Sequence, residues 1–354
     1  MSRWLSPLMA FCLSFIIIAG LAPSLGLQID RQLDFWLLWL VTLIFLALPV
    51  VYLEVGLAKR TQTSALNALL KLTRDADASP RWRVVGWLAV VFIPFLAGGL
   101  IYNTASHVVT VVNQSLATPV VFAVVAIIAM ALSFVSRQIL VLLTTVGSIV
   151  ALVAANVMGT GLTEWQLTPV EFSEWGKATI LALVASGLGL GLYWQSQLGE
   201  DSKAPATRSS LPIWIAQLLA VIAFGYFAVT AAVPAYLILI ATVAAAALML
   251  NMAREQLAQR SIAPLIQYAV LLVAFVVWIV PEISVILTPA LMLWGLTICL
   301  IYAVFAGWIM KISHLRKALN FSNELIYNLW RVAVRIVLPI SILIAIISFI
   351  RQLV

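Results

Sequence analysis

The 354-residue chain contains few side chains that titrate near neutral pH or bind metals. It has two histidines and two cysteines, and only 9% of its residues are charged. Its histidines and cysteines do not form the clusters that hold zinc. The sequence also lacks a phosphate-binding glycine loop and any pattern of Ser and His suited to nucleophilic catalysis. We therefore expect no enzyme active site and no metal or organic cofactor.

Long hydrophobic runs dominate the sequence. Hydrophobic residues make up 64% of the chain and the mean hydropathy is +1.12, which excludes a soluble globular domain and predicts an all-α polytopic membrane protein. Cys12 and Cys299 fall inside apolar runs, so we expect both to be free packing residues. Eleven windows are long enough to span a bilayer: 5–27, 35–57, 84–112, 119–135, 138–158, 174–195, 211–232, 235–252, 263–280, 283–310 and 326–350.

The basic residues predict the orientation of these eleven spans. With a cytoplasmic N-terminus, 17 of the 20 Lys and Arg side chains fall on the inner side. Only Arg31, Lys177 and Arg351 fall on the outer side, and such an asymmetry is typical of membrane proteins. The net charge of +7 therefore reflects topology and does not indicate a nucleic-acid partner.

A polar segment at 61–77 separates the second and third spans. Its leucines recur at helical spacing among Thr, Asn, Lys and Arg residues. This pattern predicts a short amphipathic helix on the inner membrane surface. A solvated linker with incidental leucines is the alternative.

Glycines interrupt the sixth span at 185–192, which reads ASGLGLGL. Each glycine destabilises a helix by roughly 1 kcal/mol relative to alanine, so the three could open the backbone. A glycine-interrupted span in the second half of a transporter is where substrate sites tend to form. The alternative is that the small residues allow close packing of neighbouring helices.

Several segments, in collinear order, resemble the neurotransmitter:sodium symporter family. The likeness covers most of the chain and is carried by ordered short motifs. These are 48–58 (LPVVYLEVGLA) in the second span, 101–104 (IYNT) in the third, 167–173 (LTPVEFS) with 185–189 (ASGLG) and Glu200-Asp201 at the sixth, and 306–308 (AGW) with Trp330, Arg331, Arg335 and Pro339 at the tenth and eleventh.

The resemblance implies a fold, a function and a location. The fold is a five-plus-five inverted repeat of the bacterial leucine transporter, with repeats at 1–158 and 174–312 and an extra helix at 325–352. The function implied is secondary transport of a small solute such as an amino acid or amine. The location is a bilayer, expected to be the bacterial inner membrane. A protein partner or a homo-oligomer is also expected.

The resemblance also implies which residues bind the solute. Tyr102 matches a family tyrosine that contacts substrate. The alternative is a buried tyrosine with an ordinary hydrogen-bond partner. Gly20, Pro23 and Gly26 interrupt the first span as the sixth-span glycines interrupt its counterpart, and paired interruptions indicate a midplane site. The candidate substrate-binding residues are Gly20, Ala22, Tyr102, Asn103, Ala185, Ser186, Gly187 and Gly189.

Glu54 lies deep in the second span, where a carboxyl group is costly and indicates function by default. The matching family glutamate braces the broken first and sixth spans through hydrogen bonds. Proton coupling is a second interpretation. A third is an interfacial residue that reaches toward Lys59.

Departures from the family pattern concern sodium and the first span. Leu183, Ala244 and Ala245 stand where the family has hydroxyls that bind sodium, and hard cations need oxygen ligands. The family signature of the first span and a twelfth span are missing. We therefore expect no sodium coupling of the usual kind. Two functions remain open: solute transport, and a transporter-derived subunit or scaffold that no longer transports.

Overall fold

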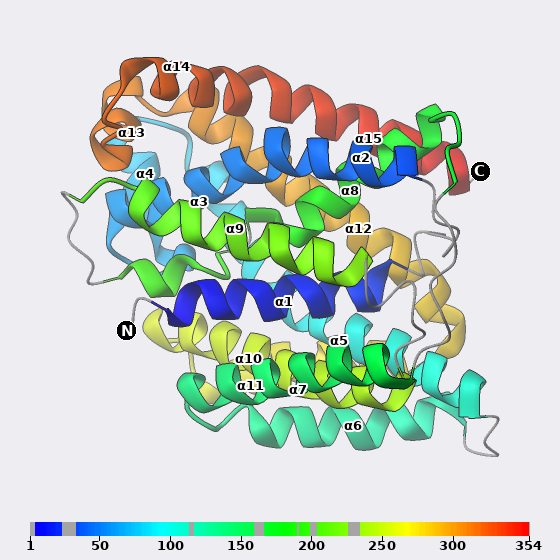
Figure 1. Cartoon of the computed structure of the whole chain (residues 1–354). Helices are drawn as coiled ribbons and strands as arrows, with labels where there is room; N and C mark the ends of the chain where they lie inside the picture. The colour runs from blue at the N-terminus through cyan, green and yellow to red at the C-terminus, as the bar shows by residue number, and fades with distance from the viewer. Residues whose placement is uncertain are drawn as a thin grey trace.

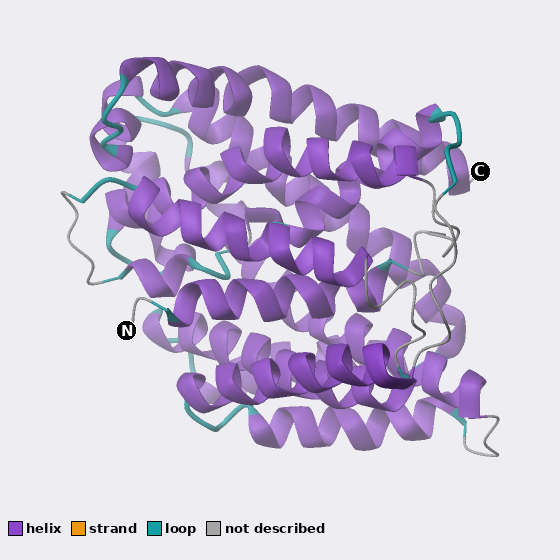
Figure 2. Ribbon diagram, in the orientation of Figure 1, coloured by secondary structure: helices purple, strands orange, loops and turns teal. Residues whose placement is uncertain are grey.

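Every regular element in the described part of the chain is helical (Figure 2). The structure is a computed structural model and describes residues 4–22, 33–112, 117–158, 166–189, 191–198, 204–225 and 234–353. The long helices lie side by side along a common direction (Figure 1). The all-α polytopic fold expected from the hydropathy is therefore confirmed.

The first five predicted spans each correspond to a helix or a helical run. The second span is continuous from Leu33 to Thr61, with a π-helical turn before Pro49. The elements are α1 (Leu5–Leu21), α2 (Leu33–Thr42), η2 (Leu43–Ala47), α3 (Leu48–Thr61), α4 (Ala65–Asp75), η3 (Pro80–Arg83), α5 (Val84–Val112), α6 (Thr118–Leu132) and α7 (Arg137–Met158).

The remaining six predicted spans are also occupied by helices, and the sixth is broken. Two further π turns, η8 and η9, lie in the tenth and eleventh spans. The elements are α8 (Phe172–Ala185), η4 (Gly187–Gly189), η5 (Trp194–Gln197), α9 (Thr207–Ala223), α10 (Ala235–Gln259), α11 (Pro264–Val276), η7 (Val277–Ile279), α12 (Pro281–Val304), η8 (Phe305–Ile309), α13 (Ile312–Leu319), α14 (Glu324–Val332), η9 (Ala333–Val337) and α15 (Leu338–Leu353).

Small residues bring the central helices together. α10 packs along α5, α7 and α1, and its alanines 244–247 are buried in these contacts. A Cβ added to Gly147 of α7 would lie 3.0 Å from the Cα of Ala241 in α10. Such close approach gives the dispersion contacts that hold helices together where lipid competes with apolar side chains.

The outer face of the bundle is apolar. α7 shows the pattern clearly, because Val146, Val153 and Val157 are exposed while Ser148 and Ala151 on its other side are buried. A large exposed apolar surface is stable in hydrocarbon and costly in water. α7 therefore presents one face to lipid and one to the protein.

The helix expected between the second and third spans is present, and its leucines pack against the protein. α4 buries Leu66, Leu69 and Leu72 completely and packs against α5 and α3. The backbone of Leu66 lies within 3.6 Å of a Cβ built on Gly86. The protein itself therefore covers the apolar face of α4, and the position of this helix at the membrane surface stays a prediction.

Candidate functional site

The sixth span opens at its glycines. α8 ends at Ala185, and the next residues include three with positive φ: Gly187 at 76°, Leu188 at 55° and Gly191 at 81°. Glycine adopts these angles without the steric penalty that a Cβ brings. The sequence left two interpretations open, an opened backbone and close helix packing. The positive φ angles at Gly187 and Gly191 favour the opened backbone. Close packing also holds at Gly191, where a Cβ would lie 2.9 Å from that of Ala65.

Glu54 closes this opening from α3. Its Oε1 accepts a hydrogen bond of 2.7 Å from the backbone N–H of Tyr193, and the amides of Gly191 and Trp194 also face the carboxyl group. Only 3% of Glu54 is exposed, so it does not reach an interface. Lys59 donates instead to the carbonyl of Ala204. This geometry is the kind that bracing of the sixth span requires.

The first span stays helical as far as it is described. α1 runs to Leu21, and Ala22 continues with helical angles, its N–H bonded to the carbonyl of Ile18. Gly20 lies against α5, where a Cβ would approach Leu100 Cδ2 to 2.6 Å, and its carbonyl accepts from Asn103 Nδ2 at 3.2 Å. The predicted interruptions at Pro23 and Gly26 lie outside the described residues.

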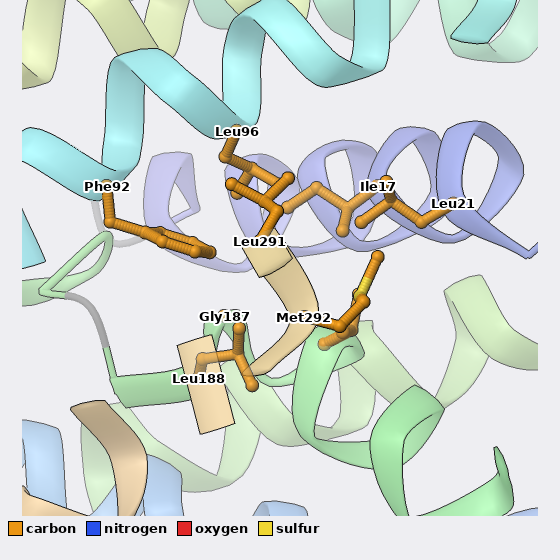
Figure 3. Close-up of a pocket in the computed structure, with 9 residues that line it drawn as sticks. Ile17, Leu21, Phe92, Leu96, Gly187, Leu188, Leu291 and Met292 are labelled. Carbon is orange, nitrogen blue, oxygen red and sulfur yellow. The ribbon is translucent and has the colours of Figure 1, made fainter. Parts of the chain in front are cut away.

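A small apolar cavity lies between α1, α5, α12 and the opened sixth span (Figure 3). Its volume is about 10 Å³, which is roughly the space of a single water molecule. Gly187 contributes backbone, and the rest of the wall consists of aliphatic, thioether and phenyl side chains. The lining residues are Ile17, Leu21, Phe92, Leu96, Val184, Gly187, Leu188, Leu291 and Met292.

Leu188, in the opened segment, packs against Gly295 of α12. Its Cδ1 lies 2.4 Å from a Cβ built on Gly295 of α12, and Phe92 Cζ lies 3.0 Å from the same position. Leu188 is 3% exposed although its left-handed backbone angle is unfavourable for leucine. Packing in this core therefore holds a strained residue in place.

Tyr102 points to another part of the molecule. Its ring packs against Phe122 and Trp278 with centroid distances of 5.9 and 5.7 Å. These partners belong to α6 and η7, so Tyr102 joins an aromatic cluster there. It does not line the cavity described above.

A polar layer, which sequence reasoning missed, lies beside the break. Ser14 Oγ of α1 donates to the carbonyl of Ala185 at 2.6 Å, while Ser186 Oγ donates within its own helix to Leu183. Ser14 and Gln217 also interact with the hydroxyl of Tyr193, and all three residues are at most 1% exposed. The available signal was the position of Ser14 and Gln217 in the middle of long apolar runs.

The positions that match the family's sodium-binding hydroxyls are packed with aliphatic side chains. Leu183 and Ala245 are fully buried and Ala244 nearly so. Ala244 and Ala245 lie within the uninterrupted helix α10. Within the described ranges, no three His, Cys, Asp or Glu side chains come together as a metal site.

Comparison with solved structures assigns the fold. The crystal structure of MhsT in complex with L-phenylalanine is similar to 98% of this chain over 98% of its own length, with a TM-score of 0.68 and 14% sequence identity. No protein-family model and no curated protein sequence matches the chain. The likeness extends over both halves and the final helix. The chain therefore has a leucine-transporter-like membrane fold.

Proposed function

We propose that this protein keeps a transporter fold without carrying an amino acid through it, and that it acts as a non-transporting subunit or scaffold in a membrane. The observation that carries this proposal is the central cavity. Its volume of about 10 Å³ is far below the several hundred Å³ typical of ligand pockets. An amino acid also needs polar groups for its charged ends, and the described lining offers only the backbone of Gly187 for that purpose.

The packing around the cavity supports the same proposal. Leu188, Phe92 and Met292 interdigitate there as core residues do, and closely packed cores resist the insertion of even one methylene group. Leu183, Ala244 and Ala245, which stand where the family has sodium-binding hydroxyls, carry no side-chain oxygen. Sodium coupling is therefore not part of the proposed function.

Cysteine accessibility tests whether the centre ever opens. In a background with Cys12→Ala and Cys299→Ala, Ile17→Cys and Met292→Cys place single thiols on the cavity wall. We expect neither thiol to react with a membrane-impermeant maleimide added to either side of a reconstituted vesicle. Ser79→Cys and Glu282→Cys are exposed controls near the two ends of the bundle and are expected to react.

Reaction of both wall thiols, each from a different side and each slowed by L-phenylalanine, would refute the proposal. That result would show alternating access with a bound solute. Reaction of neither thiol, with both controls labelled, supports a closed centre. Vesicle uptake of L-phenylalanine under a sodium gradient provides the direct measurement, and we expect no accumulation above protein-free vesicles.

Transport of a small solute is the second candidate, and one observation favours it. The sixth span is opened and its amides are held by Glu54, an arrangement a transporter needs to move this span. In a core with only a structural role, a continuous helix would be more stable than an opened one. If transport is present, we propose protons or no ion as the coupling partner, since oxygen ligands for sodium are absent from Leu183, Ala244 and Ala245.

A further inference from the structure

Two arginines interrupt the lipid-facing surface of the last span. Arg331 and Arg335 lie one helical turn apart on the α14–η9 run, so they share a face. Both are partly exposed. Exposed apolar side chains surround them on the same continuous helix, and Asn328, one turn before Arg331, is also exposed. The apolar ones include Leu325, Leu329, Val332, Ile336 and Ile340.

The length of the last span places these arginines relative to the bilayer. The run from Glu324 to Gln352 has 29 residues, about 43 Å at 1.5 Å per residue, whereas the hydrocarbon is about 30 Å thick. Counting about 20 residues back from Arg351 puts the inner hydrocarbon boundary near Arg331. Arg335 then lies one turn deeper, where a charge is costly unless an anion meets it.

Trp308 holds Arg335 in a defined position. The guanidinium carbon of Arg335 lies 4.0 Å from the centroid of the indole ring, and the indole N–H donates to the Arg335 carbonyl at 3.0 Å. Gly307 permits this approach, because a Cβ there would lie 3.0 Å from the Arg335 Cα. Trp308 itself is 56% exposed, so the stacked pair forms part of the outer surface.

The crossing of η8 and η9 makes a recess beside this pair. A cavity of about 10 Å³ lies there, and Gly307, Tyr327 and Arg331 are among its lining residues. Both crossing helices carry π-helical turns at this point, a feature that is frequent at functional sites. Arg331 therefore enters a recess that Trp308 and Arg335 border.

The described part of the chain supplies no counter-charge for these two arginines. Its four ion pairs involve other basic residues, and the nearest acidic residue along the helix, Glu324, pairs with Arg316. Two guanidinium groups on an apolar, membrane-facing surface call for an anion that the bilayer itself can deliver. Phosphate groups match the planar donor fork of arginine.

We propose that the groove between η8 and η9, lined by Trp308, Arg331 and Arg335, binds the phosphate of an anionic phospholipid in the inner leaflet. Arg331 meets the headgroup at the inner hydrocarbon boundary. The side chain of Arg335 passes over Trp308 and reaches the same phosphate. The acyl chains lie along the exposed apolar residues of α14 and α15. Basic recesses between spans on the cytoplasmic side bind anionic lipids in this way.

Native mass spectrometry of the purified full-length protein tests the site. Phosphatidylglycerol and phosphatidylcholine of the same acyl composition are titrated in parallel. For the Arg331→Gln/Arg335→Gln variant we expect phosphatidylglycerol affinity to fall roughly 30-fold, since each basic residue at an anionic surface contributes about a fivefold factor. Phosphatidylcholine binding should not change.

Arg81→Gln/Arg208→Gln is the matched control, because it removes two exposed positive charges outside the groove. It should keep its phosphatidylglycerol affinity. Equal losses in both double variants would overturn the proposal and indicate charge attraction without a site. If Arg331→Gln/Arg335→Gln fails to fold, Trp308→Leu carries the test, and unchanged selectivity for phosphatidylglycerol in that variant would overturn the proposal.

Two further measurements distinguish a bound phospholipid from a free anion and from a second copy of the chain. Inorganic phosphate is added at millimolar concentration, and we expect it not to displace the lipid; full displacement would identify a free-anion site instead. The oligomeric state of lipid-free protein is measured with and without the arginine substitutions. A change in that state would show that the groove is a contact between copies of the chain.

Discussion

At the scale of single residues, two buried polar side chains have a clear structural task. Glu54 satisfies backbone amides that the opened sixth span exposes. Asn251 of α10 donates to the carbonyls of Ser133 and Val135 at 2.9 and 3.2 Å, closing the end of α6. Where no water competes, such bonds decide whether an irregular backbone segment is tolerated.

Replacing Glu54 tests this task. We expect Glu54→Gln to unfold within a few degrees of the wild type, because the amide oxygen still accepts from the Tyr193 N–H. Glu54→Ala leaves that buried amide without an acceptor and should destabilise the protein by about 1–3 kcal/mol. Thermal unfolding in detergent measures both. Equal stability of the alanine and glutamine variants would contradict the role of Glu54 as an acceptor.

Asn251 offers an independent test far from the cavity. Asn251→Leu keeps the branched shape and heavy-atom count of the side chain but removes both donors, so two carbonyls lose their partners. A loss of about 1–3 kcal/mol in unfolding free energy is expected. Thermal unfolding beside Asn67→Leu, which changes an asparagine that is not buried, separates this effect from the general cost of adding a leucine. A similar shift of the unfolding temperature in both variants would contradict the role of Asn251 as a donor to these two carbonyls.

At the scale of elements, glycines do two different jobs. Gly147 sets the spacing of two packed helices, whereas Gly191 supplies a backbone angle of 81° at the break. The first role depends on the neighbouring helix and the second on the local backbone. Substitutions therefore separate the two.

Gly191→Ala is expected to cost about 1–2 kcal/mol from the left-handed backbone angle alone. The added Cβ would also press on Ala65 of α4. Gly86→Ala is the control, because its Cβ meets only ordinary contacts, from 3.4 Å, inside a regular helix. Thermal unfolding should show a lower midpoint for Gly191→Ala alone, and a drop of similar size at Gly86 would refute the assignment.

Gly147→Leu tests the contact between α7 and α10. The new side chain would meet the backbone of Ala241, which cannot rotate away, and overpacking of this kind typically costs about 1–3 kcal/mol. Val146→Leu, on the exposed face of the same helix, should be neutral. Two measurements check the outcome: the yield of folded protein extracted from membranes, relative to the wild type, and the unfolding temperature. Equal behaviour of the two variants would mean that α7 does not depend on close packing.

At the scale of the whole molecule, the two chain ends lie at opposite ends of the bundle. In Figure 1, α1 begins on the left and α15 ends on the right. An odd number of spans requires this arrangement. The prediction that basic loops face the cytoplasm then fixes the orientation.

Reporter fusions test that orientation. We expect alkaline phosphatase, which is active only outside the cytoplasm, to be active at the C-terminus and inactive at the N-terminus. Introducing two lysines beside Arg351, on the predicted outer side, should reduce the activity of the C-terminal fusion if basic residues set the topology. Activity of the N-terminal fusion would overturn the predicted orientation.

Composition and periodicity alone predicted the fold class and the eleven spans. The reason is that hydrocarbon imposes a length and an apolar composition on each span, which sequence shows directly. The bounds of α5, 84–112, follow from the sequence without correction. The repeat limits at 158 and 174 and at 312 and 325 stay predictions.

Tertiary structure decided what the polar and small residues do. Leucines of α4 face protein and not lipid, Tyr102 joins an aromatic cluster, and Leu188 in the opened segment packs against Gly295. None of these outcomes follows from sequence, because an apolar side chain has the same transfer energy in lipid and in a protein core. Which of the two surrounds it depends on helices that are distant in the chain, and only their packing decides it.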